Sequence, residues 1–228
     1  MNTKEVLELL ERKGSRHYAE GLARYGIQTK LRVLGVSVGT LRSIAKRIGK
    51  DHDLALGLWE TGCYEAQMLA TLVDDPKLVT LRQMNSWAAD FDNWATCDTA
   101  CFHLFDRTPF AWDKVHQWAS SPREFVKRAS FALMASLTVH DKAAPESNFR
   151  ALLPLIEEGA HDERNFVKKA VNWALRSIGK RSQPLNTASI VVARRLAKSD
   201  EAACRWVGKT ALGELESPAV KARLARRR

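Results

Sequence analysis

The sequence predicts an all-α protein, built as a HEAT-like helical-repeat solenoid in which helix pairs stack into a curved superhelix. Three observations predict this class. Apolar residues recur at helical spacing along most of the chain, for example at Leu41, Ile44, Ala45 and Ile48. Runs that alternate β-branched with polar residues, which mark strands, are nearly absent. A phrase of similar residues also returns with a period near 40, which is typical of stacked helical repeats.

The expected helices follow one another with short connections. The first covers residues 1–13, and the second covers 16–25 and ends at Gly26. Residues 31–38 are expected to be irregular, and the next helix, 40–48, begins at Thr40, a residue type that caps helix N-termini. Further helices are expected over 54–60, 64–73, 76–89, 94–105, 109–119, 122–139, 147–157, 162–179, 184–197, 200–215 and 218–227. Several of these begin with proline, which the first turn of a helix tolerates.

Three segments of the chain resemble one another and define the repeat. FVKRASFALMASL begins at Phe125, FVKKAVNWALRSI begins 41 residues later at Phe166, and the fainter WVGKTALGEL begins 40 residues after that, at Trp206. A single helix pair of this kind cannot bury its own apolar face and must stack on its neighbours. We therefore expect residues 1–228 to form one continuous repeat domain with a short basic C-terminal end.

The repeats align a positive charge in all three units. Arg128, Lys169 and Lys209 each follow the leading aromatic residue by three positions. Because neighbouring helices pack about 10 Å apart, these side chains would form a ladder along one wall. Such a ladder matches the regular negative charges of a nucleic-acid backbone. The alternative interpretation is an ordinary solvated helix face.

A second aligned position is occupied by residues of very different size. Ala132, Trp173 and Gly213 each lie seven residues after the aromatic residue. If the three units stack alike, the Trp173 ring lies where its counterparts need little volume. This favours a ring exposed in a groove, although a tryptophan on a helix is more often part of the core.

Trp94 and Asp98 are the strongest candidates for chemistry. They are four residues apart in a stretch without helix breakers, so they share one helical face. A carboxylate beside nucleic-acid phosphates is unfavourable unless it has a task, and one task is to stabilise positive charge on a sugar as a glycosidic bond breaks. The face of a tryptophan ring also attracts cations.

Composition limits the remaining possibilities. The formal net charge of the 228 residues is +10, which makes a polyanion a reasonable partner. No secretory signal, membrane span or paired cysteine framework is visible, so we expect a cytoplasmic protein with reduced thiols. Cys97, Cys101 and His103 lack a second half for a zinc site, and we predict no metal. The triple arginine at 226–228 is expected to be a solvated end, with a loose phosphate contact as the alternative, and no histidine is assigned a role.

Several segments between about Ala23 and Lys180 form a set of motifs: Ala23-Arg24-Tyr25, Leu34-Gly35-Val36, Leu41–Lys46, Asn93-Trp94 with Asp98, Val126–Ala129 and Val167–Arg176. Together they resemble the AlkD family, the bacterial DNA alkylation repair glycosylases built of HEAT-like repeats. Each motif is loose by itself, but their order and spacing together are specific.

The resemblance implies excision of N3- and N7-alkylated purines from duplex DNA without a metal or organic cofactor. We also expect the protein to be a monomer without an obligate protein partner or membrane contact. By this analogy Asp98 is the catalytic carboxylate, and Trp94 and Trp173 flank the deoxyribose of the lesion. Arg128 holds the DNA backbone and Tyr25 lies near the damaged nucleotide. Arg42 and Arg176 match further backbone contacts, beside Lys169 and Lys209 of the ladder.

The sequence departs from the family pattern at two positions, and two other classes of function are alternatives to a glycosylase. Ala95 replaces the acidic or aromatic residue that family members often carry, and the usual proline near Gly39 is missing. One alternative is a noncatalytic HEAT-repeat module that binds structured DNA or RNA through a basic concave surface. The other is a protein-interaction scaffold, against which the basic ladder and the Trp94–Asp98 pair argue.

Overall fold

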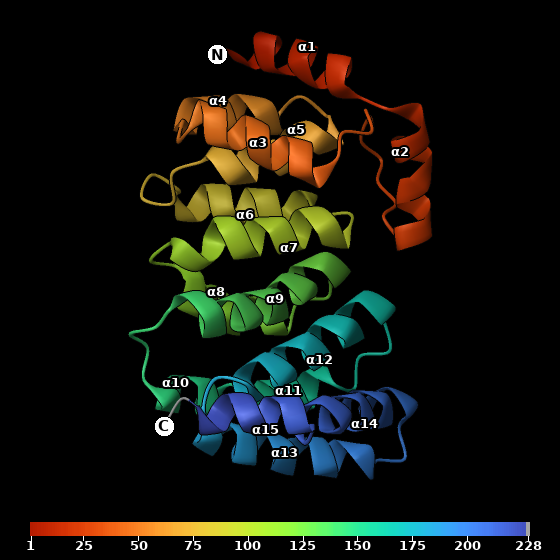
Figure 1. The fold of residues 1–228 in the computed structure, drawn as a ribbon, viewed down its shortest axis with the longest axis vertical. Coiled ribbons are helices and arrows are strands. Elements are labelled where there is room, and N and C mark those ends of the chain that lie inside the picture. Colours follow the sequence, from red (N-terminus) through yellow and green to blue (C-terminus); the bar gives the residue numbers. More distant parts are fainter. Residues whose placement is uncertain (227–228) are drawn as a thin grey trace. The chain divides into compact units, whose positions relative to one another are not determined.

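The computed structural model describes residues 1–226 and divides the chain into two compact units, Met1–Phe110 and Ala111–Arg228. The expectation of a single domain stays a prediction. The role of the basic end also stays a prediction, because Arg227 and Arg228 lie outside the described residues. The first unit contains α1 (Thr3–Lys13), α2 (Arg16–Gly21), η1 (Leu22–Tyr25), α3 (Val38–Ile48), α4 (His52–Trp59), α5 (Tyr64–Val73), α6 (Leu81–Asp90), α7 (Trp94–His103) and η2 (Phe105–Arg107). The second contains α8 (Ala111–Ala119), α9 (Glu124–His140), α10 (Glu146–Ala151), α11 (Leu153–Gly159), α12 (Asn165–Gly179), α13 (Gln183–Ala197), α14 (Ala202–Leu215) and α15 (Pro218–Ala225), as Figure 1 shows.

The prediction of an all-α protein is confirmed. Over the described residues, pairing outside helices is limited to one isolated bridge between Arg32 and Cys63. None of the helices in this part of the chain combines the length and the apolar character that crossing a membrane requires.

Several helix boundaries differ from expectation, and side-chain caps decide two of them. Ser37, and not Thr40, caps α3, since the Ser37 hydroxyl accepts a hydrogen bond from the Thr40 N–H at 3.1 Å. The helix expected from Pro76 begins at Leu81, where Thr80 accepts from the Gln83 N–H. The helix expected over 147–157 is divided into α10 and α11 near Leu152. The expected second helix ends early and continues as the 3-10 turn η1 to Gly26.

The first unit is organised around α5. Most of its residues are buried, on all sides of the helix, and α3, α4 and α7 pack against it. A stacked pair of indoles, Trp59 and Trp87, lies elsewhere in this core with ring centroids 4.0 Å apart. A helix that is buried all round places its polar residues inside the protein, so Glu65 on α5 needs local partners.

The second unit shows how consecutive repeats are joined. The equivalent rings of Phe125 on α9 and Phe166 on α12 lie 5.3 Å apart. Arg128 donates a hydrogen bond to the Phe166 carbonyl at 2.6 Å, and Asn172 on α12 donates to the Val207 carbonyl of α14 at 3.0 Å. The repeats of α9 and α12 are therefore joined by ring packing and a side-chain-to-backbone hydrogen bond, and α12 is joined to α14 by a hydrogen bond of the same kind.

Asp162, between α11 and α12, supplies a testable contribution to stability. Its carboxylate accepts from Arg164 at 2.6 and 2.9 Å and pairs with Lys127 at 3.0 Å. The Arg164 hydrogen bonds, and then Lys127, lower the pKa of Asp162 to about 2 from its ordinary 3.8. We expect Asp162→Asn to lower the free energy of unfolding at pH 7 by about 2 kcal/mol. The neighbouring exposed Glu163→Gln is the matched control.

The pH dependence follows from the same shift. Because the folded-state pKa is the lower one, the contribution is present above the ordinary pKa of 3.8 and is lost as the pH falls towards 2. Urea denaturation of wild type and Asp162→Asn should therefore differ at pH 7 and converge near pH 2. An equal difference at both pH values would contradict the role of the ionised carboxylate.

Candidate functional site

A cavity of about 320 Å³ in the first unit brings together three of the residues singled out in the sequence. Tyr25, Trp94 and Asp98 all line it. The rest of the wall is mostly apolar and aromatic: Tyr18, Leu22, Ile27, Val36, Val38, Leu41, Tyr64, Met68, Ala95 and Thr99. This volume is at the lower end of the range in which proteins bind small organic groups.

The Trp94 ring is held in place from two directions. Asn93 caps α7, because its side-chain oxygen accepts from the backbone N–H groups of Ala95 and Thr96, both at 3.0 Å. The indole N–H of Trp94 then donates to the Tyr25 carbonyl at 3.0 Å. The Tyr25 residue itself is 73% exposed, so one ring is fixed by the fold while the other faces solvent.

Asp98 lies one helical turn after Trp94, as predicted, and is half-buried. Among the cavity-lining residues of the described chain, it alone carries a carboxyl group. Cys97 and Cys101 on the same helix are fully buried. Burial raises the pKa of the Cys101 thiol, with smaller contributions from Cys97 and Asp98. Both cysteines thus fill the core, and the ionisable group that α7 presents to the cavity is Asp98.

Two further tyrosines, Tyr18 and Tyr64, line the cavity, and the sequence analysis did not identify them. Tyr64 begins α5 and is buried, and burial raises the pKa of its phenol, with Glu65 and Tyr18 adding to the effect. Its phenol therefore stays neutral and can donate or accept a hydrogen bond. Nothing in the local pattern separates Tyr64 from an ordinary core residue, because only the packing of α2 and α7 near α5 turns it towards a cavity.

Two acidic side chains hold the cavity wall. Asp92 accepts from the Thr29 hydroxyl and the Lys30 N–H, both at 2.8 Å, and so ties the segment after Tyr25 to the start of α7. Glu65 accepts from three successive backbone N–H groups, at Leu34, Gly35 and Val36, at 2.9, 2.6 and 3.2 Å. Gly35 has a φ of 79°, a backbone conformation that only glycine adopts readily. The Leu34-Gly35-Val36 segment, one of the motifs that match the family, is thus a turn whose backbone N–H groups bind the Glu65 carboxylate.

The aligned cations of the second unit differ in exposure. Lys169 and Lys209 are exposed, but Arg128 is 6% exposed and contacts the Phe166 carbonyl. The three residues occupy the same position in their repeats, but their side chains are therefore not equally exposed to solvent. Trp173, seven residues after Phe166, is half-buried. The DNA-binding roles of these residues stay predictions.

The two other predicted arginines have contrasting surroundings. Arg176 on α12 forms an ion pair with Glu214, which also accepts from Lys180 at 2.5 Å. Arg42 on α3 is exposed and lines a separate cavity of about 280 Å³ whose wall also includes Lys46 and Lys50. Contact of either arginine with DNA likewise stays a prediction.

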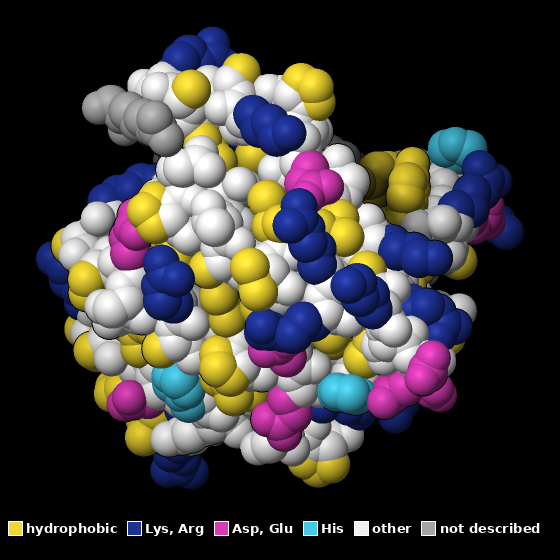
Figure 2. Space-filling view, turned by 90° about the horizontal axis from the view of Figure 1, so that it is seen from below, with side chains coloured by type: hydrophobic (Ala, Val, Ile, Leu, Met, Phe, Trp, Pro, Cys, Tyr) yellow, Lys and Arg dark blue, Asp and Glu magenta, His cyan; other side chains and the backbone are white. Residues whose placement is uncertain are grey.

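Charge by itself does not mark a binding face. On the face drawn in Figure 2, Lys and Arg side chains are interspersed with hydrophobic and acidic ones. On this face the positive side chains are thus distributed, and the case for a site rests on the cavity and its carboxylate.

Comparison with solved structures supports the predicted repeat architecture. One solved structure, described as a new family of proteins related to the HEAT-like repeat DNA glycosylases with affinity for branched DNA structures, matches with a TM-score of 0.77. The match covers 94% of this chain and 96% of that one, at 24% sequence identity. The HEAT-like repeat fold is therefore confirmed.

Comparison of sequences gives the family. Two uncharacterized proteins, from Listeria innocua and Listeria monocytogenes, are 23% and 22% identical over 177 residues, covering 76% of this chain and 77% of each relative. The model of a family described as DNA alkylation repair enzyme matches residues 6–212. A match over nearly the whole chain agrees with the resemblance carried by the motifs, and the protein belongs to the DNA alkylation repair enzyme family.

Proposed function

We propose that the protein is a DNA glycosylase that hydrolyses the N-glycosidic bond of positively charged N3- and N7-alkylated purines in duplex DNA. The observation that carries this proposal is the meeting of Asp98, Trp94 and Tyr25 at one cavity. Membership of the DNA alkylation repair enzyme family supports it.

The reaction requires little from the protein beyond stabilisation of the developing positive charge. An N3- or N7-alkylated purine is a cation, and it leaves as a neutral base when it takes the electron pair of the glycosidic bond. Positive charge then develops on the deoxyribose, and the carboxylate of Asp98 stabilises it. Water attacks the C1′ carbon and loses a proton, which completes hydrolysis. No metal or redox step is needed to balance this reaction.

The aromatic residues supply binding and orientation. The ring faces of Trp94 and Tyr25 attract a cationic nucleoside, and the fixed indole of Trp94 limits where it can lie. Trp173 belongs to the second unit, and its proposed place beside the deoxyribose rests on the family resemblance alone. Tyr64 would supply a neutral phenol within the cavity.

The direct test is release of free base from methylated duplex DNA. Wild-type protein should release 7-methylguanine and 3-methyladenine, which chromatography of the ethanol-soluble fraction measures, and should leave unmodified guanine in place. Lack of release above the spontaneous rate, from a folded protein that binds the same DNA, would refute the glycosylase proposal.

A noncatalytic DNA-binding role is the second candidate. The observation that favours it is the similarity to the solved structure described with affinity for branched DNA. Under this alternative the protein would bind a four-way junction more tightly than a duplex of equal length and would release no base. Gel-shift titrations with both DNAs, run beside the release assay, separate the two functions.

The exposed lysines of the second unit provide a test of DNA binding common to both candidates. We expect Lys169→Ala and Lys209→Ala each to weaken binding to any DNA sequence and to reduce the slope of log affinity against log salt by about 1. Lys198→Ala, at another exposed position of the same unit, is the control and should change neither quantity. Arg128→Ala is less informative, because a buried arginine also contributes to folding. Unchanged salt slopes in both lysine variants would remove them from the interface.

A further inference from the structure

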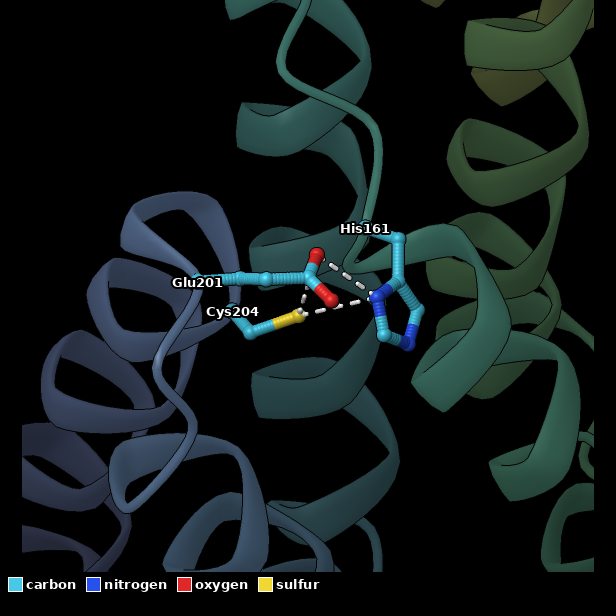
Figure 3. A group of neighbouring side chains, drawn as sticks. All are labelled: His161, Glu201 and Cys204. Atoms are coloured by element: carbon cyan, nitrogen blue, oxygen red, sulfur yellow. Dashed lines mark hydrogen bonds and ion pairs between the residues drawn. The ribbon is translucent and has the colours of Figure 1, made fainter.

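Three potential metal ligands meet in the second unit, outside the candidate site. His161, Glu201 and Cys204 converge on one point, as Figure 3 shows. The Nδ1 atom of His161 lies 2.8 Å from the Glu201 Oε2 atom and 3.6 Å from the Cys204 Sγ atom. The remaining separation, Sγ to Oε2, is 3.9 Å.

The three residues come from the connection after α11 and from the N-terminal end of α14. His161 follows α11, whereas Glu201 is the N-cap residue of α14 and Cys204 lies in its first turn. The Cys204 residue is fully buried, but the His161 and Glu201 side chains are each 56% exposed. The sulfur thus forms the floor of a site that an ion can enter from solvent.

The separations suit a tetrahedral ion. Zinc binds thiolate sulfur at about 2.3 Å and imidazole nitrogen or carboxylate oxygen at about 2.0–2.2 Å, so tetrahedral ligands lie about 3.4–3.6 Å apart. The sulfur–nitrogen separation of 3.6 Å already has this value. The hydrogen-bonded nitrogen–oxygen pair at 2.8 Å must open by roughly half an ångström, and the sulfur–oxygen pair at 3.9 Å must close by about 0.3 Å. The exposed Glu201 side chain can make that movement without disturbing the core.

We propose that His161, Glu201 and Cys204 form a mononuclear Zn²⁺ site, with water in the fourth coordination position. Thiolate and imidazole ligands select zinc over magnesium or calcium, which prefer oxygen ligands. Binding requires the His161 tautomer with its proton on Nε2, and it displaces the thiol proton of Cys204 to solvent.

The proposed ion would join neighbouring repeats. It would link the segment between α11 and α12 to the start of α14, within one compact unit. Its ligands are separate from the cavity that holds Asp98, so the zinc proposal does not depend on the proposed function. The sequence does not reveal the trio, because His161 and Cys204 are 43 residues apart and lack zinc-motif spacing.

The test is a zinc titration of the metal-free protein against a chromophoric chelator of known affinity. Wild type should bind one Zn²⁺ per chain, and Cys204→Ser and His161→Asn should each weaken binding by about 100-fold or more. Glu201→Gln should weaken it about tenfold. His116→Asn changes an exposed histidine elsewhere in the same unit and should bind like wild type.

Two further readouts keep the proposal falsifiable if one variant folds poorly. Cobalt(II) in place of zinc should give a thiolate-to-cobalt charge-transfer absorption that Cys204→Ser lacks. Zinc should also raise the melting temperature of wild type but not of His161→Asn, which alters an exposed side chain. The proposal is overturned if wild type binds no zinc, or if the bound ion persists equally in Cys204→Ser and His161→Asn.

Discussion

Asp98→Asn is expected to reduce the rate of 7-methylguanine release by roughly 10²- to 10⁴-fold while leaving DNA affinity the same or slightly higher. The substitution keeps the shape of the side chain and removes its negative charge. The rate falls because charge stabilisation is lost only as the sugar becomes cationic. Affinity is retained because a carboxylate beside DNA phosphates repels them in the ground state. Single-turnover base release and gel-shift titration measure the two quantities.

A matched control separates a chemical role from a general effect of charge. Asp53→Asn also removes one negative charge, at an exposed position on α4 of the same unit. It should release base at the wild-type rate. Circular dichroism and a urea titration check that Asp98→Asn remains folded. If the Asp98 and Asp53 variants released base equally fast, Asp98 would have no part in the chemistry.

The sequence predicted the fold well because its evidence is repetitive. Apolar spacing over many helices and the returning phrase both indicate stacked pairs, and the contact between Phe125 and Phe166 is the expected contact of equivalent residues. The helix ends were harder to predict. Ser37 and Thr40 are both good caps, and the choice between them depends on the backbone of the preceding segment.

The candidate site was predicted only where its residues are close in sequence or matched by a family motif. Trp94 and Asp98 follow from helical spacing, and Tyr25 follows from the resemblance. Tyr18 and Tyr64 line the same cavity through packing between distant segments, which no local pattern encodes. The position of Arg128 in the aligned repeats also predicted a more exposed side chain than the structure shows, because α9 is buried on most of its surface. Its counterparts Lys169 and Lys209 are exposed.

Glu65→Gln is expected to destabilise the first unit by about 3 kcal/mol or more. The fully buried carboxylate of Glu65 accepts from the backbone N–H groups of Leu34, Gly35 and Val36. Glutamine retains one acceptor oxygen but turns an N–H₂ group towards at least one of these donors. A buried donor without an acceptor then opposes folding, and the free energy of unfolding from urea titration should fall accordingly.

The same substitution should reach the cavity, because Val36 is part of its wall. We therefore expect Glu65→Gln to slow base release under conditions where the variant is still folded, although Glu65 is outside the cavity lining. Glu60→Gln, at the exposed C-cap of α4, is the control and should change neither stability nor release. A Glu65→Gln protein as stable as wild type would show that the turn at Gly35 holds its shape without the carboxylate. The cavity wall would then owe its position to apolar packing alone.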